Sequence, residues 1–307
     1  MEQHGHHHSG GHHHHHHSAN KKALLLSFIL ITIFMVVEII GGYLTNSLAL
    51  LSDAGHMLSD SAALGLSLFA VILGEKNATY QNTFGYRRFE IIAAALNGLT
   101  LVLISAYIFY ESYRRFQNPP EIQSSGMLVI SIIGLLVNIG AAFLLMRGNR
   151  EENLNVRSAY MHVLGDTLGS VGAIIASLLI FFFDWTYADP IASLIVAVLI
   201  IISGVRITKD SFHILMEGTP ENINLEEVKG QLEKLPHVYE VHDLHIWSIT
   251  SETPMLSCHI MISSTGVQDD VLFEAQHLLE HEFHIRHSTL QVERTETGCP
   301  NESQRCN

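Results

Sequence analysis

The sequence predicts a membrane protein in which an all-α bundle of six transmembrane helices is followed by a small α+β domain. Of the 307 residues, 48% are hydrophobic and only 15% are charged, which is too apolar for an ordinary soluble chain of this length. Six apolar segments are each near the ~20 residues that a bilayer requires. After the sixth segment, the pattern changes to short alternating and helical stretches.

The chain begins with a His-rich segment, residues 1–20, which contains ten histidines among glycine and serine. Such a composition cannot build a core, so this tail is expected to be disordered. It is either a natural tether that captures metal ions, a dispensable solvated tail or an expression tag. The transmembrane domain, residues 21–208, is predicted to contain six spans, at 23–44, 49–73, 89–110, 127–146, 159–183 and 190–207.

Lysine and arginine between the spans set the expected orientation. If the N-terminus is cytoplasmic, ten of these residues lie on the inner side and only Arg114 and Arg115 lie on the outer side. Because the number of spans is even, both termini are expected in the cytoplasm. The sequence therefore predicts a multi-pass protein of the cell (cytoplasmic) membrane.

The tail, residues 209–307, is expected to be a cytoplasmic domain. Residues 225–235 and 271–283 have helical periodicity, whereas 238–250, 255–263 and 288–294 alternate like strands. A helix, two strands, a helix and a strand in about 80 residues are typical of a small ferredoxin-like α+β domain. Simple alternation places His242 on the same face of the first strand as Leu244 and Ile246.

Two copies of one motif lie inside the apolar segments. His56 and Asp60 lie four residues apart in the second span, and His162 and Asp166 have the same order and spacing in the fifth. Residues at this spacing share one helical face, and two imidazoles with two carboxylates suit tetrahedral Zn²⁺. Ionisable groups in mid-membrane are costly, so transport of a metal ion is the first explanation. Asp53 is either a carboxylate on the ion's path or a cap at the start of the helix.

The C-terminal domain offers a second candidate metal site, with a regulatory role. His242, His259, His287 and Glu293 lie on or beside the predicted strands. Cys299 and Cys306 are possible additional ligands, because disulfides are disfavoured in the cytoplasm and the thiols, like Cys258, are expected to be free or metal-bound. The alternative is that these are ordinary surface histidines. Three histidines on or after the second helix of the domain are expected to be solvated: His277, His281 and His284.

Several motifs together resemble the cation diffusion facilitator family, in particular its bacterial CzcD-type branch. They are residues 46–60, 83–90, 216–220 and 241–248, together with the two His-x-x-x-Asp pairs. The resemblance implies a homodimer that exports Zn²⁺, and also Cd²⁺ or Co²⁺, in exchange for H⁺ and so provides metal resistance and homeostasis. It also implies that Zn²⁺ is both the substrate and a regulatory ligand. By motif, the transport site maps to His56, Asp60, His162 and Asp166, and the cytoplasmic site maps to His242, His259, His287 and Glu293.

Two other functions are compatible with the same ligands, namely a metal-gated cation channel and a membrane-bound metal sensor. An intramembrane metalloenzyme is disfavoured because no His-Glu-x-x-His motif accompanies the histidines, so no enzymatic activity is expected. The net charge of −13 does not favour nucleic acid as a partner. The resemblance implies a second copy of the chain, divalent cations and H⁺ as partners, and the apolar segments imply the lipid bilayer.

Overall fold

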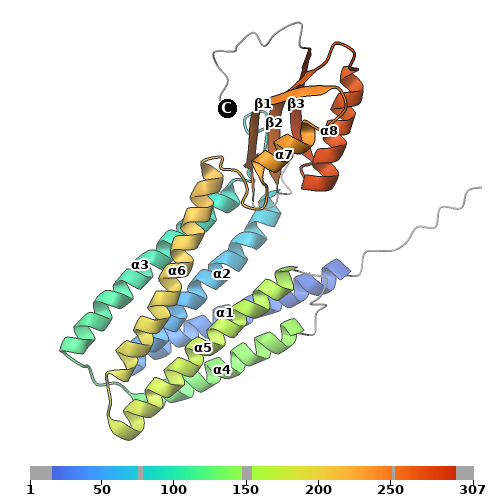
Figure 1. Ribbon diagram of the computed structural model, residues 1–307. Helices are drawn as coiled ribbons and strands as arrows, with labels where there is room; N and C mark the ends of the chain where they lie inside the picture. Colours follow the sequence, from blue (N-terminus) through green and yellow to red (C-terminus); the bar gives the residue numbers. More distant parts are fainter. Residues whose placement is uncertain (1–15, 75–78, 147–153, 251–252, 295–307) are drawn as a thin grey trace, which may run out of the picture. The chain divides into compact units, whose positions relative to one another are not determined.

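The computed structural model describes residues 16–74, 79–146, 154–250 and 253–294 (Figure 1). Six long helices correspond one to one with the six predicted apolar segments. They are α1 (His16–Thr45), α2 (Leu48–Gly74), α3 (Phe89–Gln117), α4 (Ser124–Met146), α5 (Leu154–Phe183) and α6 (Ala188–Leu215). The sequence therefore predicted the helices and their order, with ends that differ by several residues.

Among the described residues, three helical stretches are long and apolar enough to cross a membrane: Phe28–Thr45, Phe89–Gln117 and Ala188–Leu215. Shorter apolar stretches lie in α4 and α5, at Ser124–Gly140 and Thr167–Phe183. Several apolar helices are thus present, and the number of six spans stays a prediction. Helix α1 begins at His16, so the last five residues of the predicted disordered tail are helical, while residues 1–15 lie outside the described residues.

The chain forms two compact units, and each is described by itself. The first comprises residues 1–65 and 100–204, and the second comprises residues 66–99 and 205–307. Segment 66–99 therefore groups with the C-terminal residues, which chain order alone did not predict.

In the first unit, the N-terminal half of α2 packs among the other helices. Met57 joins residues of α1, and Ala49 and Leu50 join residues of α4, α5 and α6 in a second apolar cluster. Gly169 of α5 allows a close approach to α2, because a Cβ atom at this position would lie only 2.7 Å from Asp53 Oδ1. These contacts hold the part of α2 that carries His56.

In the second unit, two helices and three strands follow α6. They are α7 (Leu225–Leu232), β1 (Val238–Ser248), β2 (Pro254–Ile262), α8 (Gln268–Phe283) and β3 (His287–Arg294). The sheet has the order β1-β2-β3, with β1 antiparallel to β2 and β2 parallel to β3. Both helices and the sheet contribute to one apolar core, which includes Val228, Ile260 and Leu279. The predicted order of helices and strands is confirmed.

A β-bulge in β1 changes the face on which His242 lies. The pairing with β2 shifts between His242 and His245, and Asp243 has a positive φ of 52°. Leu244 and Ile246 therefore belong to the helix-covered core, whereas His242 pairs with His259 outside that core. The expectation that His242 shares a face with Leu244 was wrong, because simple alternation does not allow for the extra residue of a bulge.

Burial in this core raises the pKa of the Cys258 thiol from 9.0 to about 12. Because the unfolded chain loses this proton first, the contribution of Cys258 to the free energy of unfolding should be constant below about pH 9 and should fall as the pH rises toward 12. We also expect Cys258 to react with iodoacetamide at pH 8.5 far more slowly than in denatured protein, as measured by mass spectrometry. Equal rates in the two states would contradict a buried, neutral thiol.

Candidate metal sites

The two His-x-x-x-Asp pairs lie on α2 and α5, as predicted. His56 is half-buried on α2, three residues after the buried Asp53. The side chains of Asp60, His162 and Asp166 lie outside the described residues. The role of these four residues as transport ligands therefore stays a prediction.

Asp53 lies inside α2 and does not cap it. Helix α2 begins at Leu48, five residues earlier, and the Asp53 side chain is only 2% exposed. Ser170 Oγ of α5 lies 3.5 Å from Asp53 Oδ2 and accepts a hydrogen bond from Asn138 Nδ2 of α4 at 3.2 Å. Asp53 thus belongs to a buried polar group shared by three helices, one helical turn from His56, and the capping alternative was wrong.

Helices α2 and α5 pack in an antiparallel register. Leu50 of α2 shares an apolar cluster with Ala176 and Ile180 of α5, and Asp53 meets Gly169 and Ser170. As α2 proceeds along the chain, its neighbours on α5 therefore come earlier in the chain. On α2, the next helical turn after this contact carries His56.

The cap of α2 comes from Asp189 at the start of α6. The completely buried Asp189 carboxylate accepts hydrogen bonds from Ser47 Oγ at 2.6 Å, Leu48 N at 2.9 Å and Ala49 N at 3.1 Å. Backbone N–H groups at a helix N-terminus lack intrahelical partners, so a carboxylate here satisfies them and complements the helix dipole.

Arg115 of α3 completes this capping network. Its guanidinium lies 3.3 Å from Asp189 Oδ2 and donates to the Asn46 carbonyl oxygen at 2.7 Å. This network was not predicted from the sequence. Arg115 was expected only on the outer side of the membrane, and no motif connects it to Asp189, 74 residues later. An unexplained acid immediately before Pro190 was the only available signal.

The second unit contains one cluster with the spacing of a metal site. Among the described residues, His242, His259 and Glu293 are the only group of three or more possible ligands whose ligating atoms all lie within 4.8 Å of one another. His259 Nδ1 lies 2.9 Å from Glu293 Oε1. Neither ring nitrogen of the buried His242 has a hydrogen-bond partner in the described part of the chain. Buried polar atoms are costly without a partner, and a bound cation would satisfy them.

The separation of the two rings suits a tetrahedral ion. An imidazole nitrogen binds zinc at about 2.0 to 2.1 Å, so the ring centre lies about 3.2 Å from the ion. The ring centres of His242 and His259 are 5.3 Å apart, so they subtend about 110° at an ion held by both. Two nitrogens and one carboxylate oxygen at that angle are a suitable ligand set for Zn²⁺.

The other residues predicted for this site are not in the cluster. His287 lies at the start of β3, opposite Met255, whereas Glu293 lies near the end of the same strand. At about 3.3 Å per residue, this distance along the strand separates His287 from the cluster. Its ring instead meets Phe84, with 6.5 Å between ring centres. Cys299 and Cys306 lie outside the described residues.

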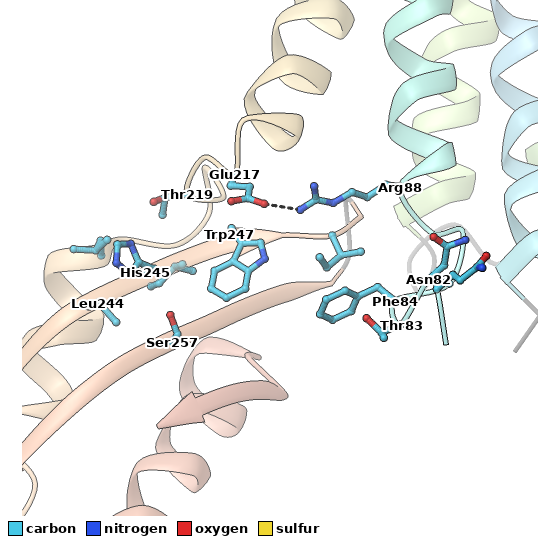
Figure 2. A pocket seen from close by; sticks show the side chains of 15 residues that line it. Asn82, Thr83, Phe84, Arg88, Glu217, Thr219, Leu244, His245, Trp247 and Ser257 are labelled. Carbon is cyan, nitrogen blue, oxygen red and sulfur yellow. Dashed lines mark hydrogen bonds and ion pairs between the residues drawn. The ribbon is translucent and has the colours of Figure 1, made fainter. Parts of the chain in front are cut away.

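A cleft of about 820 Å³ lies in the second unit (Figure 2). It is lined by Phe84 and Arg88, which precede α3, by Glu217, which follows α6, and by His245 and Trp247 of β1. Arg88 Nη2 lies 3.0 Å from Glu217 Oε1, so an ion pair joins the segment before α3 to the segment after α6.

The apolar helices and the His/Glu cluster define a multi-pass membrane protein with the ligand chemistry of a metal-handling protein. The chain belongs to the cation efflux family, as its motifs predicted. Residues 24–216 match the cation efflux transmembrane domain, and residues 220–295 match the cytoplasmic domain of cation efflux proteins.

Several characterised proteins are similar over most of their length. The chain is 54% identical to the cadmium, cobalt and zinc/H⁺-K⁺ antiporter of Bacillus subtilis, over 87% of each chain. It is 44% identical to the zinc transporter ZitB of Pectobacterium atrosepticum, over 87% of this chain and 83% of that one. It is 40% identical to the metal cation efflux system protein CzcD of Cupriavidus metallidurans, over 85% and 82%. The solved metal-bound C-terminal domain of the CzcD transporter from that organism is 36% identical and covers 23% of this chain and 99% of its own, with a TM-score of 0.23.

Proposed function

We propose that the protein is a secondary active transporter that exports Zn²⁺ from the cytoplasm in exchange for H⁺, and that it also carries Cd²⁺ or Co²⁺. Membership of the cation efflux family and the similarity to antiporters of these metals support this function. In this proposal it is a homodimer in the cell membrane, with six spans per chain, both termini in the cytoplasm and a ferredoxin-like cytoplasmic domain. It catalyses no covalent reaction.

The antiparallel register of α2 and α5 is the observation that carries the transport site. Residue 50 shares an apolar cluster with residues 173, 176 and 180, and residue 53 meets residues 169 and 170. Continuing the same register by one and two turns brings α2 segment 56–60 level with α5 segment 162–167. We therefore propose that His56, Asp60, His162 and Asp166 form one four-ligand site between the two helices.

Proton exchange follows from the chemistry of these ligands. Protons and metal ions compete for the same imidazole nitrogens and carboxylate oxygens, so protonation on the outer side promotes release of the ion. Exchange of one Zn²⁺ for one H⁺ moves a net positive charge outward and costs about 2.3 kcal/mol per 100 mV of inside-negative potential. Exchange for two protons removes this cost.

The cytoplasmic cluster is proposed as a regulatory zinc site. Its ligand set of two imidazoles and a carboxylate is proposed to bind Zn²⁺ in the cytoplasm and to stabilise this domain when cytoplasmic zinc rises. His242, His259 and Glu293 carry this proposal, while His287, Cys299 and Cys306 remain possible additional ligands from the sequence.

Zinc flux in proteoliposomes tests the transport function. We expect zinc uptake to depend on an imposed pH gradient and to be accompanied by proton movement in the opposite direction, measured with a pH-sensitive dye inside the vesicles. Zinc flux through the Asp60→Ala variant should be lower than through wild type by about tenfold or more, because a metal ligand is removed. Glu121→Gln, an exposed carboxylate outside α2 and α5, is the matched control and should transport normally.

Zinc flux without proton movement would instead indicate the metal-gated channel. If the purified protein transported no zinc, but the metal concentration in cells still changed the response of the cell to the protein, the metal sensor would be supported.

A further inference from the structure

Two histidines that the sequence analysis expected to be solvated lie side by side on α8. His277 and His281 are four residues apart, and the centres of their rings are separated by 4.2 Å with 37° between the ring planes. Both side chains are exposed. The ring of Phe273, one turn earlier on the same face, lies 6.3 Å from that of His277. The two imidazoles therefore form a pair on the surface of the helix.

This pair lies on the face of α8 opposite the domain core. The buried residues of the helix are Val271, Ala275 and Leu279, which pack against the sheet and α7. The pair is also separate from the His242 cluster, which shares no residue with it. Changes at His277 or His281 should therefore leave both the core and that cluster intact.

The spacing of the two rings allows both to bind one ion. With each ring centre about 3.2 Å from the ion, centres 4.2 Å apart subtend about 80°. The rotation about the Cβ–Cγ bond that aims each nitrogen is a broad, low-cost torsion. An angle of about 80° is close to that of neighbouring ligands in octahedral or square-planar coordination and well below the tetrahedral angle.

We propose that His277 and His281 together hold one divalent transition-metal ion, and that they prefer Ni²⁺ or Cu²⁺ to Zn²⁺. Water completes the coordination, because the pair is exposed. Imidazole suits all these ions, and affinity for a nitrogen site rises from Co²⁺ through Ni²⁺ to Cu²⁺. A role for the pair in collecting ions for export rests on the proposed function, whereas the binding itself does not.

Hydrogen exchange of the full-length protein in detergent micelles, with Ni²⁺ as the probe, tests this site locally. An ion that bridges two successive turns binds only the folded helix, so it should slow the opening of α8. At ten times the dissociation constant, exchange in the peptide that covers residues 268–284 should slow about tenfold. In the His259→Ala background, in which zinc does not act through the His242 cluster, the same measurement with Zn²⁺ should give a smaller effect than with Ni²⁺ at equal concentration.

Two variants separate this pair from the other histidines of the chain. His281→Gln removes one ligand and should abolish the effect of Ni²⁺ on α8. The double variant His281→Gln, Glu282→His keeps the number of histidines but places the second one on another face of the helix, so it should also lose the effect. Equal slowing in wild type and both variants would overturn the proposal, because the ion would then act from elsewhere.

Flux measurements on the same proteins keep the two proposals distinguishable. Wild type with slowed exchange in α8 but no metal transport would refute the proposed function and support the site. Slowed exchange together with Co²⁺ flux that is equal in wild type and His281→Gln would support binding and refute the collecting role.

Discussion

Replacement of Asp189 by alanine is expected to lower the free energy of unfolding by about 2 to 4 kcal/mol. The change would leave the buried Arg115 guanidinium with Glu111, whose Oε1 lies 3.3 Å from Arg115 Nε, as its remaining carboxylate partner. It would also remove the acceptor of Ser47 Oγ and of the backbone N–H groups of Leu48 and Ala49. Thermal unfolding of the purified protein in detergent, followed by loss of the folded peak in size-exclusion chromatography, measures the effect.

Two further variants test whether the charge pair is the cause. Asp189→Asn keeps one carbonyl oxygen as an acceptor and should be destabilised less than the alanine variant. Combining Asp189→Asn with Arg115→Met should recover part of the loss, because the buried charge of Arg115 is then removed. The free-energy changes of substitutions at two residues in direct contact are not additive. Asp210→Asn, an exposed carboxylate on the same helix, should change stability by less than about 0.5 kcal/mol. An alanine variant as stable as wild type would contradict the capping role.

The second large effect is expected from zinc at the cytoplasmic cluster. At a free Zn²⁺ concentration 100 times the dissociation constant, binding to the folded state alone adds about 2.7 kcal/mol of stability. A chelator should remove this gain, and acidification should do the same, because protons compete for the imidazole nitrogens. The difference in thermal stability with and without Zn²⁺ measures it.

His259→Ala should lose this gain, because it removes one of the three ligands that lie within 4.8 Å of one another. His287→Ala is the matched control. His287 was also predicted as a ligand, but it lies at the opposite end of β3 from Glu293, so its removal should leave the zinc effect in place. If His287→Ala lost as much of the zinc effect as His259→Ala, the three-residue cluster would be an incorrect description of the site.

Helices and strands were predicted correctly where the sequence has a periodic pattern of apolar residues. All six helices, the three strands and the two helices of the C-terminal domain were predicted in the correct order, because apolar runs and period-two alternation are local properties of the chain. The candidate ligands His242, His259 and Glu293 were also selected from their residue types and strand positions. His287 was selected by the same criteria, and only the parallel register of β2 and β3 separates it from the others.

The sequence by itself determined the membrane helices, the order of the α+β domain, the family and the chemistry of the candidate ligands. These features depend on residue type, spacing and hydropathy, which are all properties of the sequence. Tertiary structure alone decided which of these residues meet. The bulge at Asp243 turned His242 toward His259. Asp189 reached the start of α2 across 140 residues. Such contacts depend on strand register and helix packing, which are set by the whole core and leave no local pattern in the chain.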